Sequence, residues 1–317
     1  MATARVLHGV YRQGIASFAE LENVGAATRA ALSSRFRLDV MPEPRVATAA
    51  DGTRKLLFRW ADGAAIETVL IPDPPRQTVC VSSQVGCAMG CDFCATAALG
   101  LGRNLTAAEI VGQLSAARRL LGAGCRVTNV VFMGMGEPLQ NYDAVVEAIG
   151  VMRADWGFGL SGRRITVSTV GLVPALERLV RETDVAVAVS LTAANDALRD
   201  RLMPVNRRYP LARLAEACRR LPVAQRRRIV FEYVLMRGVN DSAADAGDVA
   251  TLLRGIRAKV NLIPFNAYPG SRYSAPGPAA VRAFQDHLLA RGVSATLRRT
   301  RGDDMSAACG QLAAARG

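Results

Sequence analysis

The 317-residue sequence has only two histidines, His8 and His287, and only 5% aromatic residues. So few histidines argue against a His-rich metal site. No apolar run approaches the roughly 18 residues that a membrane-spanning helix requires. The N-terminal segment MATARVLHGVYRQG also lacks the apolar middle of a secretory signal. We therefore expect no membrane segment and a soluble, cytoplasmic protein.

Lysine and acidic residues are scarce as well. Lys55 and Lys259 are the only lysines, yet Lys and Arg together number 40 against 27 Asp and Glu, a net charge of +13. A compositional bias toward arginine explains the choice of cation but not the excess of cations over anions. Because each neutralised phosphate releases counterions, the charge favours a polyanionic partner such as a nucleic acid.

Seven cysteines are present, and an odd number in a cytosolic chain argues against a framework of structural disulfides. Four of them lie within fifteen residues. Cys87, Cys91 and Cys94 have the spacing C-x₃-C-x₂-C and can converge on one metal centre from a single tight loop. Spacing alone leaves two centres open. One is zinc with Cys80 as a fourth ligand, and the other is an iron–sulfur cluster with one iron open to a small molecule.

The N-terminal part, residues 1–76, is expected to form a small α+β accessory region. Short helices are expected at 16–22 and 25–35, and strands of a small β region at 54–60 and 65–72. Pro72, Pro74 and Pro75 then interrupt the pattern. We therefore place a domain boundary between residues 76 and 77.

Residues 77–317 alternate between strand-like and helix-like segments. The expected strands are 78–83, 127–134, 163–169, 184–191, 228–236, 260–265 and 293–299. Several are β-branched runs without alternation, as expected for strands covered on both faces. About six βα units predict an α/β fold whose parallel sheet is open or closed into a partial barrel, with chemistry at the C-terminal strand ends.

A second motif, FMGMGEPLQN at residues 132–141, follows one of these strands. Its glycines let the backbone approach a ligand, and Glu137 can accept a hydrogen bond from an ammonium group. The cysteine triad follows the first strand of the βα array, with Phe93 just before Cys94. Together the two motifs resemble the signature of the radical S-adenosylmethionine superfamily.

Further strings between Arg54 and Leu312 resemble one family, the RlmN/Cfr radical RNA adenine methyltransferases. They are CVSSQVGC, FCATAALGLGRNLTAAEI, MGMGEPL, RRITVSTVGLVPAL, LMPVNRRYP, EYVLMRGVND, NLIPFNAYPG and RTRGDDMSAACGQL. The resemblance implies a partial (β/α)₆ barrel and a [4Fe-4S] cluster held by Cys87, Cys91 and Cys94. It also implies two molecules of S-adenosylmethionine per turnover, one to methylate a cysteine and one to generate a 5′-deoxyadenosyl radical.

The same resemblance implies roles for the other candidate residues. Cys309 carries the methyl group, Cys80 resolves the RNA adduct as a transient disulfide, and Glu67 is the general base for the substrate proton. Contacts to S-adenosylmethionine are implied for Gly136, Glu137, Ser168, Ser190, Leu191, Thr192 and Asn266. The sequence departs from the family at Thr192, where histidine is usual, because threonine supplies no imidazole.

Pro138 and the run Arg301-Gly302-Asp303-Asp304 resemble the adenine carbon-2 branch of the family. The expected substrate is an adenine of 23S rRNA, with a tRNA anticodon-loop adenine as a further candidate. We expect a monomer served by an external electron donor such as flavodoxin or ferredoxin. The alternatives are a Cfr-type carbon-8 methyltransferase, a radical enzyme with a small-molecule or protein substrate, and a non-catalytic zinc-dependent RNA-binding protein.

Overall fold

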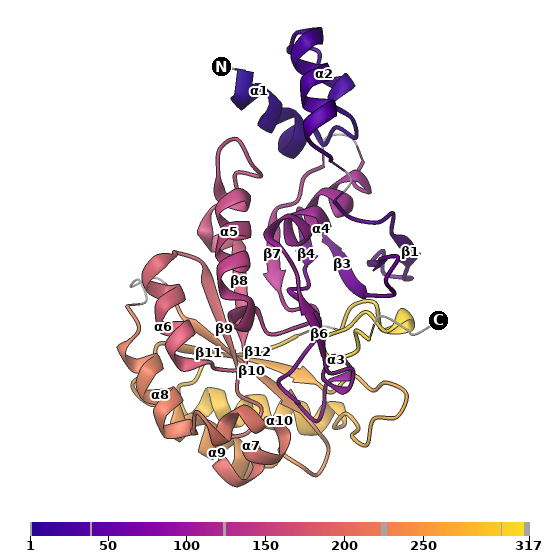
Figure 1. Cartoon of the computed structure of the whole chain (residues 1–317). Helices are drawn as coiled ribbons and strands as arrows, with labels where there is room; N and C mark the ends of the chain where they lie inside the picture. Colours follow the sequence, from indigo (N-terminus) through magenta and orange to yellow (C-terminus); the bar gives the residue numbers. More distant parts are fainter. Residues whose placement is uncertain (1, 39, 123–124, 223–226, 299, 314–317) are drawn as a thin grey trace.

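The centre of the fold is one ten-stranded sheet in the order β1-β2-β3-β4-β7-β8-β9-β10-β11-β12. The computed structural model describes residues 2–38, 40–122, 125–222, 227–298 and 300–313. Seven neighbouring strands pair in parallel: β4 (Arg76–Cys80), β7 (Asn129–Phe132), β8 (Ile165–Thr169), β9 (Ala186–Ser190), β10 (Ile229–Leu235), β11 (Ala258–Pro264) and β12 (Ala295–Leu297). They curve into the partial barrel that the βα alternation predicted (Figure 1).

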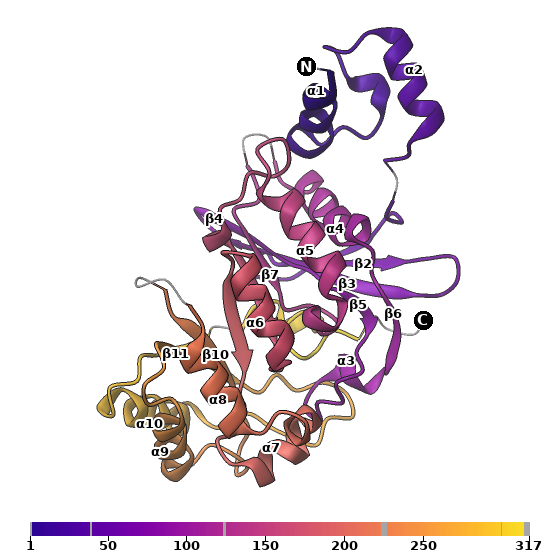
Figure 2. The same ribbon diagram turned by 60° about the vertical axis from the view of Figure 1, so that its left-hand side comes forward.

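Helices link these strands and cover the outer face of the sheet (Figures 1 and 2). They are α4 (Ala107–Arg119), α5 (Tyr142–Arg153), α6 (Val173–Glu182), α7 (Asp196–Leu202), α8 (Leu211–Arg220), α9 (Ala243–Leu252) and α10 (Pro278–Ala290). Their apolar faces and the β-branched strands form one large buried core. The expected α/β partial barrel is confirmed.

Three antiparallel strands extend the barrel sheet at one edge. β1 (Arg45–Thr48) pairs with β2 (Arg54–Arg59), β2 with β3 (Ala65–Asp73), and β3 with β4. The expected boundary between residues 76 and 77 therefore lies inside β4, and the sheet continues across it. All four residues of β1 are exposed, so this strand has no apolar alternation by which the sequence could reveal it. That residues 1–76 form a separate accessory region stays a prediction.

The first residues form a small helical unit that projects beyond one end of the barrel (Figure 2). It contains α1 (Ala2–His8), a π-helical turn (Gly9–Gln13), a 3₁₀ turn (Phe18–Glu20) and α2 (Ala26–Arg35). The helix expected over 16–22 is wrong in extent, because Ser17 and Glu20 form a capping box around the short 3₁₀ turn. Tyr11 packs against Trp156 and Phe158 and joins the unit to the barrel.

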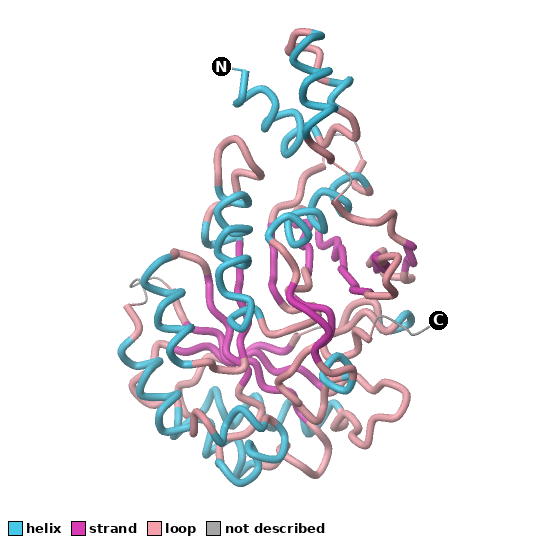
Figure 3. The backbone as a smooth tube through the Cα atoms, in the orientation of Figure 1, coloured by secondary structure: helices cyan, strands magenta, loops and turns pink. Residues whose placement is uncertain are grey.

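The segment that follows β4 forms strands outside the ten-stranded sheet (Figure 3). The strand expected over 78–83 ends at Cys80, and β5 (Gln84–Gly86) and β6 (Leu101–Asn104) form a separate hairpin around α3 (Ala95–Ala98). Remaining 3₁₀ turns cover Pro138–Asn141, Gly162–Arg164, Pro204–Arg207 and Asp303–Met305. Of the strand expected over 293–299, residue 299 lies outside the described residues.

Among the described residues, no helix combines the length and apolarity needed to cross a membrane.

Candidate active site

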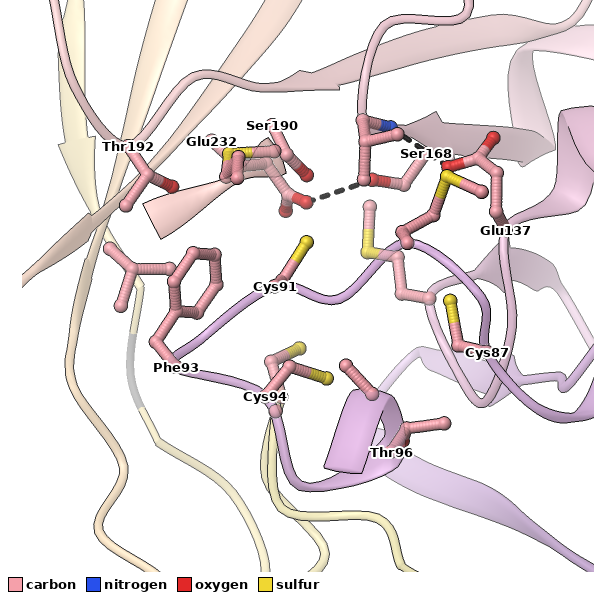
Figure 4. Close-up of a pocket in the computed structure, with 18 of the residues that line it drawn as sticks. Cys87, Cys91, Phe93, Cys94, Thr96, Glu137, Ser168, Ser190, Thr192 and Glu232 are labelled. Carbon is pink, nitrogen blue, oxygen red and sulfur yellow. Dashed lines mark hydrogen bonds between the residues drawn. The ribbon is translucent and has the colours of Figure 1, made fainter. Parts of the chain in front are cut away.

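The three clustered cysteines lie on the loop between β5 and α3. Gly86 begins this loop with a φ of 73°, and a Cβ there would lie 1.9 Å from the Gly100 carbonyl oxygen, so glycine is required. The Asp92 N–H donates to the Leu202 carbonyl at 3.0 Å and ties the loop to α7. Figure 4 shows Cys87, Cys91 and Cys94 along this loop at the edge of one cavity, which all three line.

The three thiols also act on one another electrostatically. Burial raises the pKa of Cys91 well above its ordinary value, and the charges of Cys94 and Cys87 raise it further. Burial likewise raises the pKa of Cys87, to about 11. Within the described residues, no three His, Cys, Asp or Glu side chains enclose a single-ion position. Three thiols on one loop are a suitable donor set for an iron–sulfur cluster, since positive iron would offset their mutual repulsion.

Glu137 lies across the same cavity from the cysteine loop (Figure 4). Its carboxylate accepts from the Leu139 N–H at 3.0 Å and from the Val170 N–H at 2.9 Å, which fixes its direction. Burial raises its pKa to about 7. Beside it Gly136 has a φ of 98°, and a Cβ there would lie 2.6 Å from the Gln84 Cβ. This open backbone and the buried carboxylate suit the ammonium group of an amino acid.

Three hydroxyl residues at neighbouring strand ends also line the cavity: Ser168, Ser190 and Thr192. The Ser168 hydroxyl donates to Glu232 at 3.0 Å. Thr192 is fully buried, and its Oγ1 has no hydrogen-bond partner in the described part of the chain. A buried hydroxyl left free at a cavity wall fits a polar ligand, because burial without a partner is costly. The cavity therefore suits S-adenosylmethionine beside the cluster.

Cys309 and Cys80 line one pocket although 228 residues separate them in the chain. Cys309 lines the cofactor cavity and also a smaller adjoining pocket, and Cys80 lines that second pocket. Their charges act on each other, since Cys309 helps burial to raise the pKa of Cys80 to about 12. Asn266 donates to the Cys309 carbonyl at 3.1 Å and so holds the C-terminal segment that carries Cys309 in place. Because Cys80 lies in the second pocket, zinc held by Cys80 and the triad is not the arrangement found.

Besides Cys80, two predicted site residues do not line the cofactor cavity. Leu191 is fully buried in the main core, so only its backbone lies near the strand-end residues. Glu67 is buried on β3, where it forms an ion pair with Lys55 at 3.0 Å. Its other oxygen accepts from the Ala313 N–H at 3.0 Å. Glu67 therefore contacts the C-terminal segment that carries Cys309.

Sequence reasoning missed Glu232 and Arg298. Glu232 lines the cofactor cavity, and Arg298 lines the pocket of Cys80 and Cys309. The Arg298 Nη1 lies 3.5 Å from Glu232 Oε1. Glu232 stands in the apolar strand RIVFEYVLM, and the rule that a carboxylate in such a strand faces out or is functional could have found it. Arg298 gives no such signal, because its position depends on the fold.

Comparison with known proteins agrees with this site. A model of the Radical SAM superfamily matches residues 81–248. The chain is 52% identical to the dual-specificity RNA methyltransferase RlmN of Anaeromyxobacter sp. (strain Fw109-5), over 98% of this chain and 84% of that protein. Identity is also 52% to RlmN of Syntrophobacter fumaroxidans, with 96% and 89% coverage.

A solved structure is similar over nearly the whole chain. The crystal structure of a radical SAM methyltransferase from Sphaerobacter thermophilus matches with a TM-score of 0.94 and 49% identity, over 98% of this chain and 92% of that one. Enzymes of this kind use a [4Fe-4S] cluster and S-adenosylmethionine, the pair that the cysteine loop and the facing cavity suit. The chain therefore belongs to the RlmN family of radical S-adenosylmethionine RNA methyltransferases.

Proposed function

We propose that this enzyme methylates carbon 2 of an adenine in 23S rRNA and of an anticodon-loop adenine in tRNA. The observation that carries the proposal is the position of Cys309, which lines the cofactor cavity on one side and the Cys80 pocket on the other. The Cys309 thiol can thus receive a carbon beside the cofactor, and the Cys80 thiol can later free it from its adduct with the RNA. We propose that the enzyme acts as a cytoplasmic monomer with a flavodoxin or ferredoxin as electron donor.

Cys87, Cys91 and Cys94 would hold the cluster, and the strand-end residues would hold S-adenosylmethionine. When bound, the two supply a 5′-deoxyadenosyl radical that removes a hydrogen atom from a methyl group. The Glu137 carboxylate would bind the ammonium group of the methionine moiety. The Thr192 hydroxyl would take a further polar group of the ligand, in place of the imidazole usual in the family.

Cys309 would carry the carbon as a thioether and deliver it to the base. In the release step the Cys80 thiolate forms an S–S bond to the Cys309 sulfur. The bond from that sulfur to the methylene carbon breaks, and its electron pair takes up a proton to complete the methyl group. An external dithiol then reduces the disulfide.

Glu67 would take the proton from carbon 2 of the base, and the unpaired electron left on the adduct would return to the bound cluster, which gives the closed-shell thioether. The contact of Glu67 with the Ala313 N–H links this carboxylate to the segment that delivers the carbon. Its ion pair with Lys55 holds the side chain in place on β3.

The test separates the two lone cysteines by role. Cys80→Ala should accept the methyl group and form the adduct but fail to release it, so the purified protein carries RNA covalently attached to Cys309. Cys309→Ala should carry none. Mass spectrometry before and after nuclease digestion measures the adduct, and it also gives the position of the methyl group on the adenine released by wild-type enzyme.

Cys218→Ala is the matched control, because Cys218 is buried on α8 away from both pockets. It should carry no RNA and should methylate at the wild-type rate. RNA-free Cys80→Ala protein, with its cluster intact and RNA supplied, would refute the proposed division of labour.

A further inference from the structure

A half-buried cation, Arg298, lines the same pocket as Cys80 and Cys309. Arg298 follows β12, where its N–H donates to the Leu262 carbonyl at 2.9 Å and fixes the start of the side chain. The guanidinium reaches into the pocket that Cys80 and Cys309 also line. Its Nη1 lies 3.5 Å from Glu232 Oε1 and 3.6 Å from the Met133 sulfur. The side chain is thus held between a carboxylate and the thiol pair.

The charges in this pocket act on the thiols in opposite directions. Burial and the neighbouring Cys309 raise the pKa of Cys80, whereas Arg298 lowers it and Glu232 raises it. Burial also raises the pKa of Cys309. Arg298 lowers it, and Glu232 and Cys94 raise it.

A second arginine of the pocket has other partners. Arg301 pairs with Asp73 at 3.3 Å and with Asp51 at 3.9 Å. Among the described residues, Arg298 is the cation that acts on the charge of both thiols.

Release of the RNA requires Cys80 as a thiolate, since the thiol form is a poor nucleophile. A buried thiol beside a second thiol strongly disfavours that charge. We propose that Arg298 is a positioning residue that stabilises the thiolate form of Cys80 beside Cys309, and that Glu232 holds Arg298 in place. This inference rests on the proposed function of the two cysteines.

The first experiment follows decay of the adduct in a single turnover on cluster-loaded enzyme, by rapid quenching between pH 6.5 and 9. Arg298→Gln should slow decay on the order of tenfold at each pH, because one unit of thiol pKa changes the thiolate fraction tenfold. Arg298→Lys keeps the charge, so its decay constant should stay within about threefold of wild type. Threefold corresponds to a change of only about half a pKa unit. The decay constant is measured per adduct formed, so loss of folded protein lowers its amplitude and not its rate.

Arg301→Gln is the matched control, because it removes the same charge from the same pocket at a residue paired with other carboxylates. It should leave the decay constant unchanged. Equal decay in Arg298→Gln and wild type would overturn the inference. An equally slow decay in Arg301→Gln and Arg298→Gln would also overturn it. So would decay in Arg298→Lys as slow as in Arg298→Gln.

A second measurement needs no RNA. Reduced, cluster-loaded protein is mixed with oxidised glutathione, and peptide mapping follows the Cys80–Cys309 disulfide. Arg298→Gln should form it on the order of tenfold more slowly, and an unchanged rate would overturn the inference. If Cys80→Ala traps no RNA, the proposed function fails, while this thiol exchange still decides the role of Arg298.

Discussion

Thr192 combines two features that are unusual for a buried residue. Its φ is 56°, in the left-handed region that β-branched residues rarely adopt. The Asn240 side chain donates to its carbonyl at 2.7 Å, which helps to hold this conformation. The backbone turn aims the hydroxyl at the cofactor cavity, where it lacks a partner within the described residues. Threonine thus offers a short polar contact at the position where the family usually has histidine.

We predict that Thr192→Ala weakens binding of S-adenosylmethionine by about 1 kcal/mol, roughly fivefold, because one hydrogen bond to the ligand is lost. Equilibrium binding to cluster-loaded protein measures this. Thr53→Ala is the control, since the Thr53 hydroxyl is also buried without a partner among the described residues but lies away from the cavity. Equal affinity in Thr192→Ala and wild type would contradict the assignment.

Individual site residues were predictable to different degrees. Cys87, Cys91 and Cys94 could be found because their spacing is local and one loop carries them. Cys309 and Cys80 could be paired only through family resemblance, because no local pattern connects residues so far apart in the chain.

Helix α7, on the connection between β9 and β10, also supports the cluster loop. Its Arg199 is fully buried, and the guanidinium donates to the main-chain carbonyls of Val170, Ser190 and Leu191 at 2.9–3.2 Å. These carbonyls lie at the ends of β8 and β9, beside the cofactor cavity. Arg199 also donates to Asn206 at 2.9 Å, which in turn bonds two aspartates. One side chain therefore fixes the two strand ends and the helix together.

We predict that Arg199→Met lowers the free energy of unfolding by about 3 kcal/mol, because several buried carbonyls lose their donor at once. Urea unfolding of the cluster-free protein measures this. Arg201→Met on the same helix should change stability by less than about 0.5 kcal/mol, since Arg201 is exposed. A similar small loss in Arg199→Met would show that the network adds little.

Among the helices and strands, the sequence predicted those whose apolar residues follow a clear periodicity and missed those without one. The parallel strands are apolar runs and their helices have one apolar face, so both could be recognised. The exposed β1, the short hairpin β5–β6 and α7 depend on partners distant in sequence. Arg199 shows why, because an arginine in a helix gives no sign of burial until the strand ends around it are placed.

The whole molecule carries a charge of +13, and the RNA substrate is a polyanion. We predict that log Kd for RNA rises linearly with log salt concentration, with a slope of several units, because each phosphate contact releases about 0.7 to 0.9 counterions. Fluorescence anisotropy with a labelled RNA measures Kd as the salt concentration is raised from about 50 to about 300 mM. Binding of S-adenosylmethionine is the control and should vary little. A flat response for RNA would contradict phosphate-based recognition.

The C-terminal segment crosses back from the last strand of the sheet to the antiparallel strands at its other edge. Asp304 accepts from the Ala50 N–H at 3.0 Å, and Ala313 donates to Glu67 on β3. A Cys80–Cys309 disulfide would therefore join the two sides covalently and close a ring of about 230 residues. Cross-linking so long a loop removes entropy from the unfolded chain, on the order of 5 kcal/mol. The enzyme would then be most resistant to unfolding just after it releases each methylated RNA. Reduction of the disulfide would restore the active dithiol form, which unfolds more easily.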